Sequence, residues 1–242
     1  MFGDAGLLED GTDDFELFIN VLSNENLAMT QYASGAHFSS NYGAYINESM
    51  SWLNAAVDPI FPVVFLNTDH LELCDDNQSS NVKDIASDRE TVNKAEVVIT
   101  KILVERFESY GLSRRSIGIM SPFRSQVHAL NSVLNAASGG SNNSSRSLGK
   151  KELYEISTID KFQGRDKDCI ILSSVRSLSD GSAGNLLRDW RRVNVAVTRA
   201  RKKLIMIGSV TILQQIPVLD ELIKLMRSRR CIVDLPRVVH CS

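Results

Sequence analysis

Residues 62–66 read Pro62-Val63-Val64-Phe65-Leu66, a short apolar run followed at once by the polar Asn67-Thr68-Asp69. A continuous apolar run of this length, without alternation, is typical of a strand that is buried on both faces of a parallel sheet. Similar runs recur downstream and predict strands at 117–120, 154–157, 169–173, 204–208 and 231–234. The run at 62–66 is therefore the first strand of a predicted parallel sheet.

Helical periodicity occupies the intervals between these runs. Apolar residues at helical spacing from Val92 to Phe107 predict a helix that begins with a capping box at Ser87 and Glu90 and ends at Gly111. Further helices are expected through 127–134, 186–201 and 217–227, and residues 138–149 indicate a flexible surface loop. Strands alternating with helices predict an α/β fold, with right-handed crossovers and helices on both faces of the sheet.

Charge divides the chain unevenly, although its 242 residues carry a formal net charge of only −2. Residues 1–82 contain 13 acidic residues and no Lys or Arg, so residues 83–242 hold all 27 basic residues against 16 acidic ones. A nucleic-acid partner would meet the basic part. Residues 1–60 show weak periodicity and are expected to be an irregular acidic segment, with the main domain spanning 61–242.

Several protein classes are disfavoured by composition. The four cysteines (Cys74, Cys169, Cys231, Cys241) form no Cys-x-x-Cys pair, and with only four His residues no metal site is expected. The acidic first 20 residues do not resemble a secretory signal, and the apolar stretch Ile60–Leu66 is too short to span a bilayer. The sequence therefore predicts a soluble intracellular protein that does not use a membrane.

Sites in open parallel sheets form at the carboxyl ends of strands, where this sequence places four polar segments: Asn67–Asp69, Ser121–Gln126, Thr158–Asp166 and Arg176–Asp180. Gly164, inside the third of them, permits a positive φ or a close approach of the backbone. The hydroxyl, amide and carboxylate groups around it suit phosphate, ribose or metal-bound water. Taken alone, this stretch is equally well a polar turn.

A second candidate is the predicted helix around 186–203. On a helical wheel Arg188, Arg192, Arg199 and Lys203 lie opposite an apolar face, and Asp189 is the only acid between Leu186 and Lys203. A solvated basic face normally interleaves Glu with Lys, whereas unpaired Arg residues favour bidentate contacts to phosphate. The pattern indicates phosphate binding, with an ordinary solvated face as the alternative.

Together these segments resemble three motifs of superfamily-1B helicases, in the family's order. Residues 158–166 (Thr-Ile-Asp-Lys-Phe-Gln-Gly-Arg-Asp) resemble motif V, residues 191–201 resemble motif VI, and residues 121–126 resemble motif IV. The resemblance covers roughly residues 60–236 and is weak for 1–60. It implies a RecA-like fold of the P-loop NTPase type and the second motor domain of a helicase.

Within that superfamily the chain resembles the eukaryotic DNA replication ATP-dependent helicase/nucleases of Okazaki-fragment processing and end resection. The similarity lies in Leu186–Arg192, Phe65–Asp69 and Ile232–Pro236. RNA-surveillance helicases usually have Pro where Trp190 stands and Glu where Asp166 stands. An RNA helicase half of that type, or a non-catalytic nucleic-acid-binding fragment, remains the alternative.

The resemblance implies a role for each matching residue. Arg199 is expected to be the catalytic arginine finger, pointing outward from the carboxyl edge of the sheet to ATP on the other motor domain. Nucleotide contacts are implied for Gln163, Gly164, Asp166 and Arg192, where Asp166 is near the ribose or linked to the finger and Arg192 touches a phosphate or docks motif VI. Single-stranded DNA contacts are implied for Ser121, Pro122 and Thr158. For Arg124 and Gln126, capping or packing is an equal alternative.

The 242 residues contain no Gly-x-x-x-x-Gly-Lys-[Ser/Thr] P-loop, since the nearest stretch, Ser144–Lys151, lacks the first Gly and the final hydroxyl. Walker B, the nuclease domain and its iron–sulfur cysteines are likewise not recognised. ATP and Mg²⁺ are therefore expected on a first RecA-like domain, and the isolated chain is expected not to hydrolyse ATP. The resemblance further implies 5′→3′ movement on DNA and a nuclear location, with a mitochondrial one also open.

Overall fold

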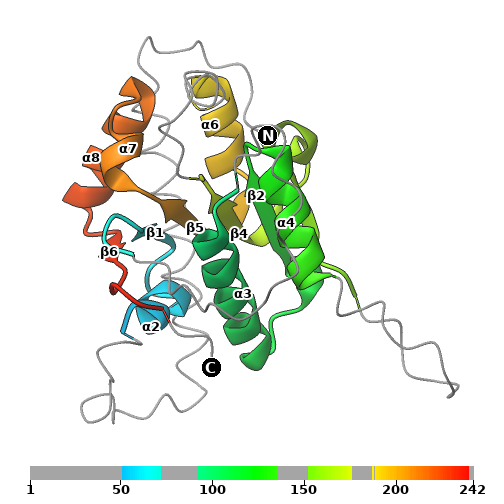
Figure 1. Cartoon of the computed structure of the whole chain (residues 1–242). Coiled ribbons are helices and arrows are strands. Elements are labelled where there is room, and N and C mark those ends of the chain that lie inside the picture. Colours follow the sequence, from blue (N-terminus) through cyan, green and yellow to red (C-terminus); the bar gives the residue numbers. More distant parts are fainter. Residues whose placement is uncertain (1–50, 72–91, 136–151, 176–186, 188, 240–242) are drawn as a thin grey trace, which may run out of the picture.

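A six-stranded parallel sheet forms the centre of the molecule (Figure 1). The computed structural model describes residues 51–71, 92–135, 152–175, 187 and 189–239. The strand order is β3-β2-β4-β5-β1-β6, and every pairing is parallel. The strands are β1 (Val63–Asn67), β2 (Ile117–Ser121), β3 (Glu155–Thr158), β4 (Lys167–Ser173), β5 (Ala200–Gly208) and β6 (Ile232–Asp234). All six predicted strands are present.

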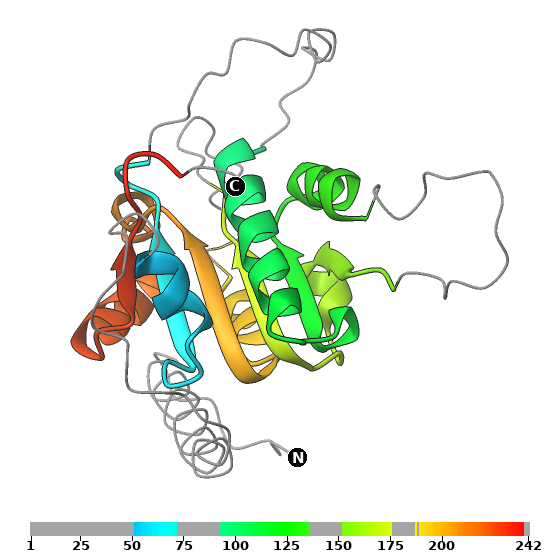
Figure 2. The same cartoon turned by 90° about the horizontal axis from the view of Figure 1, so that it is seen from below.

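Helices cover both faces of this sheet (Figures 1 and 2). One apolar core packs α2 (Ser51–Val57), α3 (Lys94–Ser109) and α4 (Arg124–Leu134) on one face. The other core packs the 3₁₀ turn η4 (Ile159–Phe162) and helices α6 (Trp190–Val197), α7 (Val210–Leu213) and α8 (Pro217–Ser228) on the opposite face. This arrangement confirms the predicted RecA-like α/β class. In the part of the chain that the structure describes, no helix is long and apolar enough to cross a membrane.

The predicted helix over 186–201 is wrong at its carboxyl end. Helix α6 stops at Val197, and Ala200 already pairs with Lys167 as the start of β5. Lys203 therefore belongs to a strand and is only 6% exposed. Its ammonium group donates to the backbone carbonyls of Asp58 (2.8 Å) and Phe61, and burial lowers its pKa to about 8. The continuous basic stripe inferred from the helical wheel does not exist.

The helix before β2 begins later than expected. Its N-cap is Asn93, whose Oδ1 accepts from the Glu96 amide at 3.2 Å, whereas Ser87 lies outside the described residues. The core also extends upstream of residue 61, where the domain was expected to begin. Trp52, Leu53 and Ala56 of α2 are at most 3% exposed and pack against β1 and α3. Residues 1–50, the loop 138–149, Arg176–Asp180 and Arg188 lie outside the described residues.

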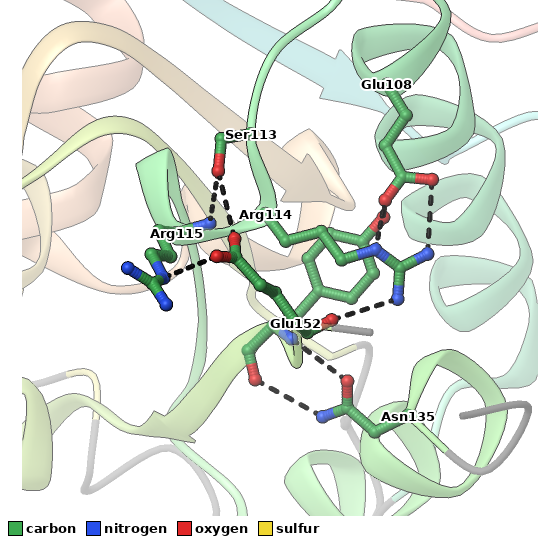
Figure 3. A network of polar contacts seen from close by, with 7 residues as sticks. Glu108, Ser113, Arg114, Arg115, Asn135 and Glu152 are labelled. Carbon is green, nitrogen blue, oxygen red and sulfur yellow. Dashed lines mark hydrogen bonds and ion pairs between the residues drawn. The ribbon is translucent and has the colours of Figure 1, made fainter. Parts of the chain in front are cut away.

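A polar cluster joins elements at the amino edge of the sheet, where η2 (Arg114–Ser116) leads into β2 (Figure 3). The Arg114 guanidinium lies 4.5 Å from the centroid of the Tyr154 ring and pairs with the Glu108 carboxylate. Tyr154 donates its hydroxyl to Glu108 at 2.6 Å, while Asn135 exchanges two hydrogen bonds with the Tyr154 backbone. The ends of α3 and α4 are thereby fixed to the start of β3.

Candidate nucleotide and nucleic-acid interface

The segment that resembles motif V runs from one edge of the sheet to the other. Thr158 ends β3 at the carboxyl edge, in register with Ser121 at the end of β2. Lys167, nine residues later, begins β4 at the amino edge, because β3, β2 and β4 are all parallel. At about 3.3 Å per residue of strand, the two edges lie roughly 15–20 Å apart. One segment therefore connects two separate candidate sites.

Close packing on β2 allows this crossing. Phe162 of η4 is fully buried, and a Cβ built on Gly118 would come within 2.5 Å of its ring. Only glycine leaves room for the aromatic ring to lie directly on the strand. Ile159, one 3₁₀ turn earlier, is buried in the same core, so the two apolar residues of η4 both face the sheet.

Gln163 and Gly164 form a tight turn after η4. Gln163 has φ −55° and ψ 131°, Gly164 has φ +77°, and the Arg165 amide donates to the Phe162 carbonyl at 3.1 Å. These values match a type II turn, whose third position needs a positive φ. Both residues are exposed, and nothing lies within 4 Å of a Cβ built on Gly164. The predicted positive φ is confirmed, and the turn presents open backbone to solvent.

Arg199 lies at the amino edge of the sheet, so the expectation that it points from the carboxyl edge is wrong. The physical reason is the direction of α6, which runs antiparallel to the strands and delivers Arg199 directly to the start of β5. Its carbonyl accepts from the Lys167 amide at 3.1 Å, which places it beside the start of β4. The Gln163 turn reaches the same edge, because the motif V-like segment also ends there.

The Arg199 side chain is held in place but remains partly accessible. Nη1 lies 3.0 Å from Asp166 Oδ1, Nη2 donates to Thr198 Oγ1 at 3.2 Å, and Nε donates to the Val195 carbonyl at 3.2 Å. These contacts use three of the five guanidinium N–H donors. The side chain is 24% exposed. A guanidinium with two remaining N–H donors and a full charge is chemically able to bind a phosphate oxygen.

Two salt bridges join the motif V-like segment to the segment that resembles motif VI, and a third joins the residues that follow them on β4 and β5. Arg192 Nε lies 3.1 Å from Asp160, Arg199 pairs with Asp166, and Lys202 Nζ lies 3.3 Å from Asp168. Exposed pairs of this kind contribute about 0–1 kcal/mol each, so their main effect is to fix alignment. Arg192 was expected either to touch a phosphate or to dock motif VI. Its salt bridge to Asp160 joins α6 to η4, which is a docking contact.

The residues at the carboxyl edge that were expected to contact DNA differ in the exposure of their side chains. Ser121 is fully buried, and its hydroxyl accepts from the Phe123 amide at 3.3 Å, so its side chain offers no surface to a ligand. Pro122 and Thr158 are half-buried, and Arg124 is exposed in the first turn of α4. Gln126 is fully buried and packs instead. Of the two hydroxyl residues expected to contact DNA, Thr158 is accessible, and Ser121 is set aside.

A buried polar network beside this edge was missed by sequence reasoning. Glu96 is fully buried and accepts hydrogen bonds from Ser173, Val175 and Asn93. The sequence signal was an N-cap residue followed three positions later by Glu, which occurs at Asn93 and Glu96 as well as at Ser87 and Glu90. Within the described residues no group of three or more His, Cys, Asp or Glu side chains could hold a metal ion.

The molecule is thus a RecA-like α/β domain with Arg199 held by Asp166 at the amino edge of its parallel sheet. The chain belongs to the AAA domain family, whose model matches residues 21–211, and it is a helicase C-terminal domain related to the DNA2 proteins.

The relatives are much longer than this chain. The human protein named DNA replication ATP-dependent helicase/nuclease DNA2 is 39% identical over 191 residues, which are 79% of this chain and 16% of that protein. The mouse protein of the same name is 34% identical over 238 residues, 98% of this chain and 20% of its own length. The fission yeast protein (Schizosaccharomyces pombe) is 35% identical over 189 residues, 78% of this chain and 12% of its own.

Among solved structures, the C-terminal domain of a possible DNA helicase from Lactobacillus plantarum WCFS1 matches with a TM-score of 0.41 and 12% identity. The match covers 73% of this chain and 86% of that domain.

Proposed function

We propose that this chain is the C-terminal motor half of an ATP-dependent 5′→3′ DNA helicase/nuclease that acts in DNA replication and repair in the nucleus. Its task is to supply Arg199 to ATP and Mg²⁺ held on a first RecA-like domain, and part of the track for single-stranded DNA. The names of the relatives support DNA as the substrate. By itself the chain is inactive, because its 242 residues contain no P-loop motif.

The observation that carries this proposal is the contact between Asp166 and Arg199 at 3.0 Å. Two segments 33 residues apart, which resemble motifs V and VI, meet there at an open edge of the sheet. Arginine suits this position because its charge persists at all working pH values and its planar fork matches phosphate oxygens. Such a finger stabilises the charge that develops on the transferred phosphoryl group.

The same segment links the nucleotide side to the DNA side. Asp166 and Gly164 stand at the amino edge, and Thr158 stands at the carboxyl edge. Because η4 is packed on Gly118 and tied to α6, a shift of Arg199 relative to the sheet is transmitted to Thr158 through a short, tightly packed connection. Closure and opening of the cleft around ATP would then move the DNA contact.

The first test is binding of the 242-residue chain to a fluorescein-labelled oligo(dT), with an RNA strand of the same length for comparison. The proposal predicts salt-sensitive binding that prefers DNA, and no ATP turnover by the chain alone. Thr158→Ala should weaken binding about tenfold, the effect of losing one hydrogen bond to a charged phosphate. Thr158→Ser should retain affinity, as should Ser132→Ala on the outside of α4. Failure to bind DNA, or a clear preference for RNA, would contradict the assignment.

A further inference from the structure

Glu96 is an unusual carboxyl group, because it is fully buried and the three groups that donate hydrogen bonds to it are uncharged. Its Oε2 accepts from the Ser173 hydroxyl at 2.6 Å and from the Val175 amide at 3.0 Å, and its Oε1 accepts from Asn93 Nδ2 at 3.1 Å. A buried carboxyl group is costly unless its oxygens are satisfied by such donors. The three donors come from α3 itself and from the exit of β4.

Gln126 extends the network to a second strand end. Its side-chain amide makes a two-way contact with the Asn93 backbone: Oε1 accepts from the amide at 2.9 Å, and Nε2 donates to the carbonyl at 3.1 Å. Nε2 also donates to the Ser173 hydroxyl at 3.0 Å. Because Nε2 can only donate, the Ser173 hydroxyl oxygen accepts from it, and the hydroxyl hydrogen is donated to Glu96. The hydrogen bonds therefore run in one donor-to-acceptor direction, from Gln126 of α4 through Ser173 of β4 to Glu96 of α3.

The hydrogen-bond network contacts the backbone at Val175. The Ser174 amide makes a bond to the sheet, donating to the Ile207 carbonyl at 2.9 Å, and the next amide, that of Val175, turns to Glu96. Val175 has φ +58°, in the left-handed region, and it is 4% exposed. A β-branched residue rarely adopts this conformation, which persists only where surrounding contacts impose it. The Glu96 carboxyl group supplies such a contact.

We propose that Glu96 is a positioning residue that keeps the left-handed exit of β4 in place and ties it, through Ser173 and Gln126, to the start of α4 after β2. Two neighbouring strand ends at the carboxyl edge then move as one unit beside Thr158. The consequence for DNA rests on the proposed function, whereas the role at Val175 does not. The role differs from capping of α3, because the Asn93 side chain already serves as the N-cap.

The test combines Glu96→Ala and Val175→Gly in a double-mutant cycle on the full chain. Glycine adopts a positive φ without strain, so the glycine variant should no longer need the carboxyl group. We expect Glu96→Ala to speed hydrogen exchange of the Val175 amide, and to weaken oligo(dT) binding, each about tenfold. In the Val175→Gly background the same change should alter oligo(dT) affinity less than twofold. Glu105→Ala, on the exposed face of the same helix, should show no such coupling.

Two further variants keep the test decisive if Glu96→Ala does not fold. Glu96→Gln preserves an acceptor oxygen and should leave the Val175 amide protected. Ser173→Ala cuts the link to Gln126 but leaves the bond from the Val175 amide to Glu96, so that amide should stay protected. Equal losses of affinity from Glu96→Ala in both backgrounds, or an unchanged Val175 exchange rate, would overturn the proposal. If the unaltered chain binds no DNA, the proposed function fails, while the exchange measurements still decide the role of Glu96.

Discussion

Arg199 and Lys203 are four residues apart in the chain, yet they have opposite environments. Arg199 is partly exposed and paired with Asp166, whereas Lys203 is buried against two backbone carbonyls. A helical wheel placed both on one face because nothing local marks the end of α6. The pairing of Ala200 with Lys167 on a distant strand decides where the helix stops. The sequence showed that both residues are basic, but it did not show that Lys203 is buried and Arg199 is partly exposed.

Glu96 gives a prediction at the same scale. Burial raises its pKa to about 7 from an ordinary value of 4.5. The folded protein therefore binds this proton more tightly than the unfolded chain, so the stabilisation is complete below about pH 4.5 and is lost as the pH rises through 7. The loss amounts to roughly 3 kcal/mol at most. We expect urea unfolding of the unaltered chain to show this decline between about pH 4.5 and 7.

Glu96→Gln should remove most of that decline, because the amide keeps the shape of the side chain and cannot lose a proton. Glu105→Gln is the matched control, since Glu105 lies on the same helix with its side chain 57% exposed. An identical pH dependence in the unaltered chain and the Glu96→Gln variant would show that Glu96 does not titrate in this range.

At the scale of elements, the crossing by η4 is the feature that organises the site. The sequence indicated a turn between two strands, and placed the whole of it at the carboxyl edge. It did not indicate that β2 lies between β3 and β4, so that the turn must cross a strand. The cue was present in Gly118, a glycine inside an apolar strand, which often marks a close approach.

Gly118→Ala should destabilise the domain by about 1–3 kcal/mol, because the added methyl group would overlap Phe162 and Ile170. Gly164→Ala should cost about 1 kcal/mol, since open space surrounds that position and only the positive φ is unfavourable. Urea unfolding of both variants gives the comparison. A Gly118→Ala variant as stable as the unaltered chain would mean that η4 does not lie on β2.

The acid–base pairs between η4, β4, α6 and β5 should have little effect on stability. Asp166→Asn and Asp168→Asn should each change the free energy of unfolding by less than about 1 kcal/mol, because both pairs are partly exposed. The same unfolding experiment checks this. A loss of several kcal/mol would show that these pairs hold the fold together rather than align two segments.

At the scale of the whole molecule, the alternation of apolar runs and helices was sufficient to predict the sheet and its two covered faces. It could not divide the candidate residues between two edges, because that depends on strand order and on the direction of α6. Thr158 and Arg199 were both expected at the carboxyl edge, but the structure places them at opposite edges of the sheet. Ser121 was expected at the surface, yet its hydroxyl serves the turn after β2.

The proposed role of Arg199 in completing an ATP site on a neighbouring domain can be tested by DNA-stimulated ATP hydrolysis. The enzyme for this test is a chimaera in which this chain replaces the matching part of the human DNA2 protein. Arg199→Ala should lower the rate by about 10³-fold or more with little loss of ATP affinity, as expected for an arginine finger. Arg227→Ala, an exposed arginine on α8, should leave the rate unchanged. A chimaera that hydrolyses ATP equally well with and without Arg199, or not at all with it, would contradict the account.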